Sequence, residues 1–248
     1  MEENTLFNAV SEITASLQKS SEYQASCQCC SLACEKLETI AQHLYARKEE
    51  LQTRCSCDTV RKEYASGSML HRGYYCPSPT RDIIVGNAKR GKLLKRLTCV
   101  SKPSYEYGFD TDGKLLYCKW LNNGEPTHIE YLIYEDHGIF GITLDCDDNL
   151  AYLTVETLRD GRLTDYSFGI FSSSCSTFRC NVMEQEHYEY DTQGLCSCDM
   201  HQYIQASATS PAVYQHSGKF EFQRKNGMLT SYTDQHGHEY QVRTRRKA

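Results

Sequence analysis

The sequence predicts an α+β fold in which an N-terminal helical hairpin leads into a long curved antiparallel β-meander. Residues 4–63 contain no glycine or proline, and their apolar residues recur at helical spacing. From residue 105 onward, short alternating segments are separated by turn signals. The 18 tyrosines suit a pleated, half-buried surface. We therefore expect a helical segment at 1–64, a basic linker at 65–104 and a meander at 105–248, packed as one unit.

Two helices are expected in the first segment. The first carries apolar side chains spaced four, three and four apart, at Leu6, Val10, Ile13 and Leu17. The pair Ser20-Ser21 offers a break and an N-cap for the second. The second carries a heptad seam interrupted by Lys48, at Cys27, Cys30, Cys34, Leu37, Ala41, Leu44, Leu51 and Cys55. This stripe must pack on the first helix, on the sheet or on a second copy, so an intramolecular hairpin and dimerisation through residues 22–55 both remain open.

Residues 65–104 contain four glycines and three prolines, a density that disfavours long regular structure. We expect a linker there, with a strand beginning within Lys95–Val100.

Turn signals divide the rest of the chain into hairpins. They occur 11 to 14 residues apart, at Gly113, Gly124, Gly138, Asn149 and Gly161. Residues 172–177 and 206–211 are predicted to be longer loops, and the last turns are expected at Asn226-Gly227 and 235–237. This spacing predicts a meander of about ten to twelve short strands.

One unit recurs within these hairpins. Its clearest copy is Tyr107-Gly-Phe109-Asp110-Thr-Asp-Gly113-Lys-Leu115, its second is Tyr188-Glu-Tyr190-Asp191-Thr-Gln-Gly194-Leu195, and a looser third spans 232–240. The unit resembles the YD repeats of Rhs-type proteins. The whole layout also looks like small uncharacterised proteins of Firmicutes, some of which look like immunity partners of polymorphic toxins. This resemblance implies a bacterial protein that binds and neutralises a basic toxin.

Charge is distributed unevenly. Residues 105–200 hold 18 Asp and Glu against 5 Lys and Arg, a net charge of −13, whereas residues 65–104 hold 8 Lys and Arg against 1 Asp, a net charge of +7. An acidic sheet face would attract a cationic protein and repel nucleic acid. Alternatively, the basic segment lies against the acidic sheet of the same molecule. The candidate partner-binding carboxylates are Asp110, Asp112, Glu135, Asp136, Asp145, Asp147, Asp148, Asp160 and Asp165.

Motifs for catalysis and metal binding are absent or incomplete. The chain has no G-x-S-x-G, H-E-x-x-H, P-loop or G-x-G-x-x-G sequence. Cys27-x-x-Cys30 could form half of a zinc site, but Cys55-x-Cys57 is too closely spaced for the other half. Cys196-x-Cys198 as a redox pair is a weaker alternative. We therefore expect neither a metal nor a cofactor.

The sequence favours a non-catalytic protein-binding module. A structural oligomer that displays the hairpins and an enzyme with an unrecognised site are the alternatives. An acidic start at Met1-Glu2-Glu3 without a signal-peptide pattern, and the absence of a long apolar run, predict a cytoplasmic protein that does not bind membranes.

Overall fold

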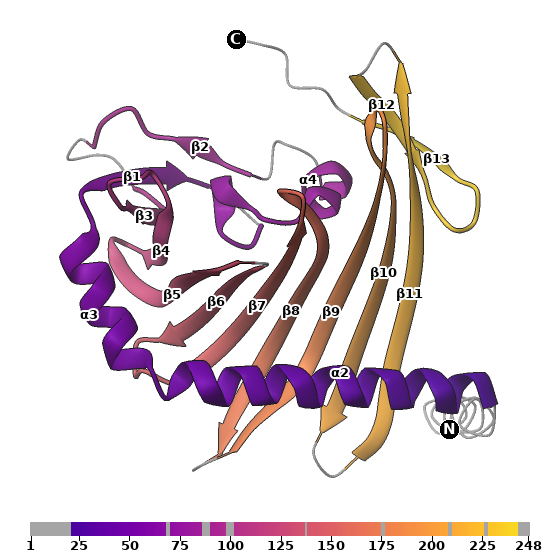
Figure 1. Cartoon of the computed structure of the whole chain (residues 1–248), viewed down its shortest axis with the longest axis horizontal. Coiled ribbons are helices and arrows are strands. Elements are labelled where there is room, and N and C mark those ends of the chain that lie inside the picture. Colours follow the sequence, from indigo (N-terminus) through magenta and orange to yellow (C-terminus); the bar gives the residue numbers. More distant parts are fainter. Residues whose placement is uncertain are drawn as a thin grey trace, which may run out of the picture.

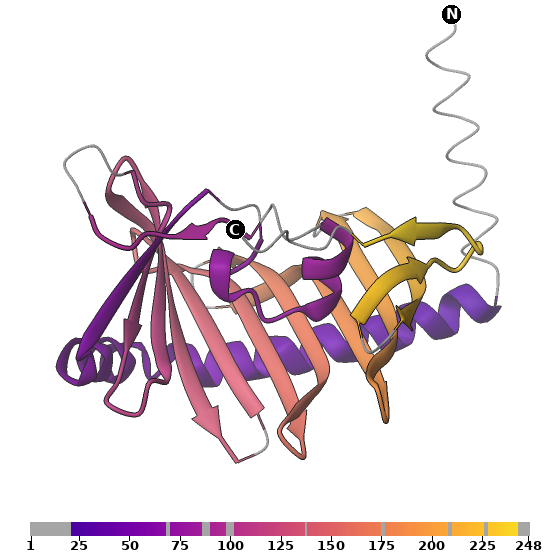
Figure 2. The same cartoon turned by 90° about the horizontal axis from the view of Figure 1, so that it is seen from above.

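The computed structural model describes residues 21–67, 70–85, 90–97, 102–136, 138–174, 177–207, 210–225 and 228–242. These residues form one large curved sheet with a long helix on one face and a short capping segment on the other (Figures 1 and 2). The predicted α+β class, with helices followed by an antiparallel meander, is confirmed.

The sheet has 13 strands in the order β13-β12-β11-β10-β9-β8-β7-β6-β5-β4-β3-β1-β2. Strands β3 to β13 follow one another in sequence order, and β1 lies between β3 and β2. The strands are β1 (Arg61–Ser66), β2 (Lys92–Leu93), β3 (Tyr105–Phe109), β4 (Leu115–Asn122), β5 (Glu125–Glu135), β6 (Gly138–Asp145), β7 (Leu150–Arg159), β8 (Arg162–Ser174), β9 (Thr177–Asp191), β10 (Gly194–Ser207), β11 (Ser210–Lys225), β12 (Met228–Thr233) and β13 (Glu239–Gln241).

Two consecutive helices, α2 (Ser21–Tyr45) and α3 (Lys48–Asp58), cover one face of the sheet. Their apolar stripe is buried from Cys34 to Cys55 and packs against sheet residues such as Leu153 and Met183. The sheet of the same chain therefore covers the stripe that could otherwise have formed a dimer seam. The expected first helix, at residues 6–17, lies outside the described residues.

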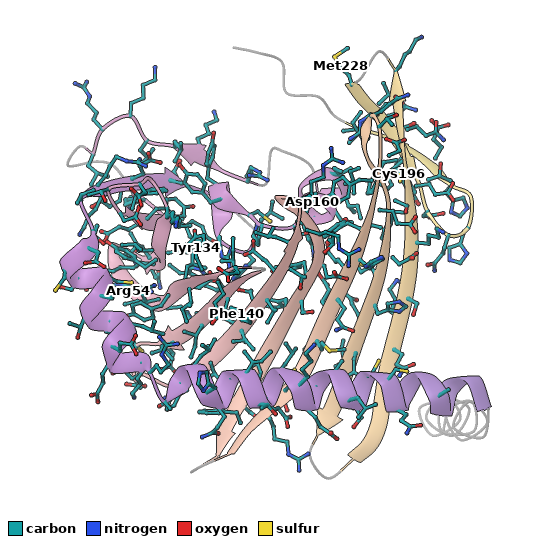
Figure 3. The ribbon with its side chains drawn as sticks, in the orientation of Figure 1. Arg54, Tyr134, Phe140, Asp160, Cys196 and Met228 are labelled. Atoms are coloured by element: carbon teal, nitrogen blue, oxygen red, sulfur yellow. The ribbon has the colours of Figure 1, made fainter. Side chains whose placement is uncertain are left out.

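The long second helix expected from the seam is divided in two. The helix breaks at Ala46-Arg47, and α3 turns away to follow the curve of the sheet (Figure 1). Arg54 on α3, labelled in Figure 3, donates a hydrogen bond to the carbonyl oxygen of Leu132 on β5 at 2.5 Å, and this bond ties α3 to the sheet. None of the helices in the described part of the chain is apolar over enough length to cross a membrane.

The boundary expected at residue 64 is wrong, because β1 begins at Arg61 within the segment predicted to be helical. Its backbone pairs with β3 over Arg61–Ala65 and with β2 at Ala65 and Ser66. Long-range pairing of this kind overrides local helical preference. Only Lys92–Leu93 form a strand near the one expected at Lys95–Val100, whose last three residues lie outside the described part.

Part of the predicted linker is a capping segment on the sheet. Residues 70–85, which we call the cap, contain the 3₁₀ helix η1 (Gly73–Tyr75) and the helix α4 (Pro79–Val85). The cap lies on the sheet face opposite α2 (Figure 2). Its Arg72, Ser78 and Thr80 are buried against that face. Glycine and proline therefore interrupt regular structure here without making the segment a spacer.

Two expected loops are strands instead. Ser172, Ser173 and Ser174 pair with Arg179, Phe178 and Thr177 across β8 and β9, so the strands extend through most of the serine-rich stretch. Strands β10 and β11 likewise reach Ser207 and Ser210. The backbone ladder is indifferent to serine side chains, which is why local composition misjudged these segments.

Both faces of the central strands are buried, although their chemistry differs. On the helix side, Tyr131 and Leu153 belong to the main apolar core. On the cap side, the residues adjacent to them in the sequence, Glu130 and Thr154, are polar and buried. Because neighbouring residues in a strand point to opposite faces, one face forms an apolar core and the other forms a polar site under the cap.

Candidate functional site

The predicted acidic residues do not form a single surface. In a meander, successive turns alternate between the two rims formed by the strand ends. Asp110, Asp112, Glu135, Asp136 and Asp160 belong to one rim, at the turns that follow β3, β5 and β7; Asp160 is labelled in Figure 3. Asp145, Asp147 and Asp148 belong to the opposite rim, at the turn between β6 and β7, and Asp165 lies on β8.

Two of these carboxylates complete the turns that hold them. Asp110 Oδ1 accepts backbone N–H groups of Asp112 and Lys114 at 3.0 and 2.8 Å. Asp145 Oδ1 accepts the equivalent groups, two and four residues later, at 2.9 and 2.8 Å. Burial opposes ionisation of Asp145, but the bonds from Asn149 and from the backbone of Asp147 hold its pKa below the usual value. These groups therefore act first as turn caps.

The same turn recurs outside the acidic set. Asp234 Oδ1 accepts the backbone N–H groups of His236 and His238 at 2.9 and 3.0 Å, again two and four residues later. The fourth position has a positive φ, at 79° in both Gly113 and Gly237. This hydrogen-bond pattern is the physical basis of the recurring Asp-x-x-Gly unit in the sequence.

Other predicted carboxylates have specific partners. Asp165 lies 2.7 Å from His187 Nδ1, and Asp148 Oδ1 accepts a hydrogen bond from Gln52 at 3.0 Å. Of the predicted metal or redox cysteines, Cys55 is buried in the core and Cys57 is exposed, and the side chain of Cys27 is not described. Cys196 and Cys198 both lie on β10, the first partly exposed and the second buried. Among the described residues, no group of three His, Cys, Asp or Glu could hold a metal ion.

A pocket lies between the cap and the sheet. Its volume is about 410 Å³, within the range of small-molecule sites. We call it the aromatic pocket, because its lining includes the rings of His71, Tyr105, Trp120, Tyr152, Tyr166 and Phe168. Ser78 and Arg81 of the cap and Glu184 of β9 supply its main polar groups.

Four of the rings form a closed set of neighbours. Trp120 and Tyr152 are stacked with centroids 5.3 Å apart, and Tyr152 and Phe168 are stacked at 5.6 Å. From the cap, His71 contacts Phe168 at 5.2 Å and Trp120 at 6.0 Å. Trp120, Tyr152 and Phe168 come from β4, β7 and β8, which only a strongly curved sheet can bring together. All four rings are half-buried, so they remain accessible from the pocket.

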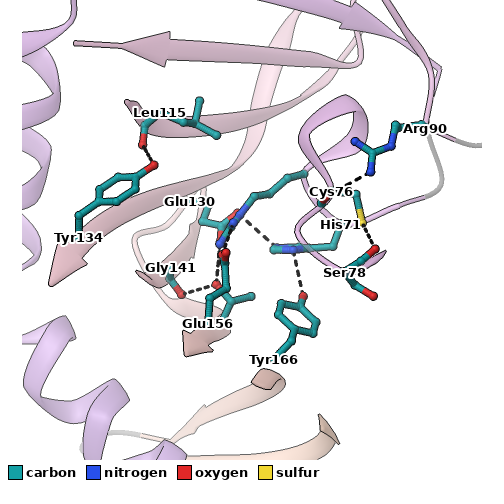
Figure 4. A network of polar contacts seen from close by, with 12 residues as sticks. His71, Cys76, Ser78, Arg90, Leu115, Glu130, Tyr134, Gly141, Glu156 and Tyr166 are labelled. Atoms are coloured by element: carbon teal, nitrogen blue, oxygen red, sulfur yellow. Dashed lines mark hydrogen bonds and ion pairs between the residues drawn. The ribbon is translucent and has the colours of Figure 1, made fainter. Parts of the chain in front are cut away.

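Next to His71, which lines the pocket, Arg72 of the cap holds a buried ion network with Glu130 and Glu156, both labelled in Figure 4. It donates to Glu130 through Nε and Nη2 at 3.0 and 2.8 Å, and through Nη1 to Glu156 at 2.5 Å. Its Nη2 also donates to the hydroxyl of Thr154 at 2.8 Å. His71 Nε2 lies 3.2 Å from Glu130. Burial disfavours the charged form of Glu130, but Arg72 and His71 more than offset it and hold its pKa well below the usual range.

A second polar cluster joins α4 to β9. Arg81 Nε donates to Glu184 at 2.8 Å, and a second bond from Arg81 Nη2 makes the pair bidentate. Ser78 Oγ donates to Glu186 at 2.7 Å and accepts the backbone N–H of Arg81 at 3.0 Å, which caps α4. Tyr188 also donates to Glu186. Burial dominates at Glu186 and raises its pKa to about 7.

This site was not among those predicted from the sequence. The net charges of the sequence segments conceal the site, because basic residues of the cap neutralise buried glutamates of the sheet. Arg72 pairs with Glu130, and Arg81 pairs with Glu184. The alternative that the basic segment lies against the acidic sheet of the same molecule holds for these two pairs. A usable signal was present, because Glu130 lies between Ile129 and Tyr131, and an isolated carboxylate in an apolar strand must be paired when it is buried.

Comparison with protein-family models and with curated proteins found no match to this sequence. The geometry of the pocket and the charges around it are therefore the basis for assigning a function.

Proposed function

We propose that this protein is a non-catalytic binding module that holds part of its partner in the aromatic pocket. One observation carries the proposal: an accessible pocket of about 410 Å³ is lined by rings from β3, β4, β7 and β8, while the carboxylates beside it are held by hydrogen bonds or ion pairs. Rings on rigid strands provide contact area at a low cost in conformational entropy, which suits binding.

The proposed partner is a cationic protein. Exposed carboxylates on both rims, including Asp112, Asp136 and Asp147, would attract a positively charged surface and speed encounter. A basic toxin is the partner implied by the resemblance to immunity proteins, and neutralisation would then follow from occupation of the toxin's basic site.

A displayed library of random peptides tests the proposal across many candidate sequences at once. The wild type should enrich Lys- or Arg-containing peptides at 50 mM NaCl and release them at 300 mM. Phe168→Leu, which changes a ring in the pocket, should lose this enrichment. Phe220→Leu, which changes a partly buried ring on β11, is the matched control and should keep it. Equal enrichment by the wild type and Phe168→Leu would refute the proposal.

One observation favours a hydrolytic enzyme as a second candidate. The pKa of Glu186, raised by burial to about 7, suits a general base, and its partner Ser78 lines the pocket. Hydrolysis of nitrophenyl ester substrates, measured with the wild type, Ser78→Ala and Glu186→Gln, tests this candidate. Activity lost in both variants would support it, whereas rates equal to the buffer rate in all three proteins would eliminate it for this substrate class.

A further inference from the structure

We infer that the aromatic pocket recognises an organic cation, meaning a positively charged nitrogen group carried on an apolar stem. This inference rests on the proposed binding function and adds the chemical class of the bound group. It also links the pocket to a cationic partner, because a basic side chain of that partner has this chemistry.

The protein's own side chains leave the pocket incompletely filled. Protein interiors are packed closely enough that voids larger than a water molecule are few. A space of about 410 Å³ between the cap and the sheet is far larger than such a void. The rings of Trp120, Tyr152 and Phe168 are half-buried around it, whereas Tyr166 and Tyr105 are buried in its wall. The accessible rings therefore have free surface for a bound group.

The aromatic rings that line the pocket have surfaces that attract cations. The face of an aromatic ring carries partial negative charge and attracts a cation that lies within about 6 Å of the centroid. Tryptophan is the best such ring, and Trp120 has Tyr152 and His71 as neighbours at 5.3 and 6.0 Å. Because Trp120, Tyr152 and Phe168 are stacked on one another, a cation would contact the parts of these rings that line the pocket and not the faces in mutual contact.

Buried charged groups lie around the pocket. Four buried carboxylates face the cap, those of Glu130, Glu156, Glu184 and Glu186. Two guanidinium groups, of Arg72 and Arg81, pair with them. A third, of Arg90, donates to the carbonyl oxygens of Tyr74 and Cys76 in the cap. When all four carboxyl groups are ionised, they exceed the three guanidinium groups by one, and the resulting field favours a cation over an anion.

Arg81 strengthens this preference. It lines the pocket and would be the natural partner for an anion, but it is engaged with Glu184 in a bidentate pair. An anionic ligand would have to compete with this carboxylate and would also meet Glu186 behind it. A cation is attracted by Glu184 and Glu186 and repelled by Arg81, whose charge is offset by its bidentate pair with Glu184.

Trp120 is the only tryptophan in the chain, so its fluorescence reports directly on the pocket. The full chain would be titrated with benzyltrimethylammonium, with its uncharged isostere neopentylbenzene and with the anion benzylsulfonate, all at one ionic strength. We expect a saturable change with the cation and about tenfold weaker binding of the uncharged isostere, on the scale of a desolvated cation–π contact. The anion should give no saturable change.

Each other outcome overturns the inference in a recognisable way. If the uncharged isostere binds as tightly as the cation, the pocket remains a binding site, the proposed function survives and the charge preference is wrong. If the anion binds most tightly, the assignment of the field is wrong. If none of the three probes gives a saturable change, neither the inference nor the pocket-based function survives.

Two variants with matched controls separate charge recognition from shape. Tyr152→Leu should weaken cation binding about tenfold and isostere binding much less, and Glu184→Gln should weaken only cation binding. Tyr240→Leu, at an exposed ring on β13, and Glu189→Gln, at an exposed carboxylate on β9, should leave both affinities unchanged. Circular dichroism would verify that each variant folds, and Phe168→Leu would replace Tyr152→Leu if the latter does not fold. If a pocket variant loses affinity for the cation and for the uncharged isostere equally, the inference is overturned.

Discussion

Replacing Arg72 with methionine removes the cation that holds two buried carboxylates. Methionine has a similar length and an apolar stem, so the change removes charge and hydrogen bonds with little loss of volume. In the wild type, Arg72 contacts Glu130 through two nitrogen atoms, Glu156 through a third and Thr154 through Nη2. Because Glu130 is 0% exposed, water cannot replace these contacts without opening the cap.

The expected loss in the free energy of unfolding is about 3–5 kcal/mol at pH 7, the usual cost of leaving one member of a buried ion pair without its partner. Summing the separate hydrogen bonds would overestimate the effect, because Glu130 can take up a proton once Arg72 is absent. A loss of this size is a large share of the roughly 5–15 kcal/mol that stabilises a typical domain.

The effect should depend on pH. Because the folded-state pKa of Glu130 lies below its ordinary value of 4.5, the ion pair stabilises the wild type above that pH and is lost as the pH falls through the lower, folded-state value. In Arg72→Met, burial without the cation makes the neutral carboxyl the preferred folded form. The difference between the two proteins should therefore shrink as the pH falls below about 4.5.

Urea unfolding followed by far-UV circular dichroism measures these differences. Arg72→Met/Glu130→Leu, which removes both charges, should recover a substantial part of the loss. Arg159→Met, at the exposed last residue of β7, should change stability by less than about 0.5 kcal/mol. A loss below about 1 kcal/mol for Arg72→Met would refute the reasoning, as would a double variant no more stable than the single one.

Three further predictions concern the core, the turns and the second buried cluster. Leu51→Ala, at a position 0% exposed, should cost about 2–5 kcal/mol in urea unfolding, whereas Leu32→Ala, at 59%, should cost little. Asp110→Ala should cost about 1 kcal/mol by removing a turn cap, against almost nothing for Asp112→Ala. Glu186→Gln should stabilise the chain more at pH 8 than at pH 5. The raised folded-state pKa of Glu186 makes the wild type lose stability as the pH rises from about 4.5 through 7, and glutamine removes that loss. An equal effect on the free energy of unfolding at pH 5 and pH 8 would contradict this.

The sequence was most informative where structure depends on neighbouring residues. Glycine and aspartate at Gly113, Gly124 and Asp160-Gly161 marked turns correctly, because these residues adopt the positive φ that tight turns require. The heptad spacing in the second helix identified the side that is buried. The same local reasoning failed at Arg61–Ser66 and at Ser172–Ser174, where partners distant in the sequence complete the sheet.

The candidate binding residues show the limit of charge counting. The totals correctly indicated that basic residues precede an acidic sheet, but not that Arg72 and Arg81 would neutralise carboxylates inside the molecule. They also did not reveal that alternate turns place Asp110 and Asp145 on opposite rims. Both results depend on which strands are neighbours.

By itself, the sequence determined the class of the fold, the order of helices before strands and most of the turns. Each of these follows from the spacing of apolar and turn-forming residues that are close together in the sequence. Only the tertiary structure decided which face the cap covers and how far the sheet curves. That curvature brings Trp120 on β4 close to Tyr152 on β7 and Phe168 on β8. Strands β7 and β8 are neighbours in the sheet, but β4 is adjacent to neither. The aromatic pocket is therefore a property of strand twist and packing accumulated over the whole sheet, which no local pattern of residues encodes.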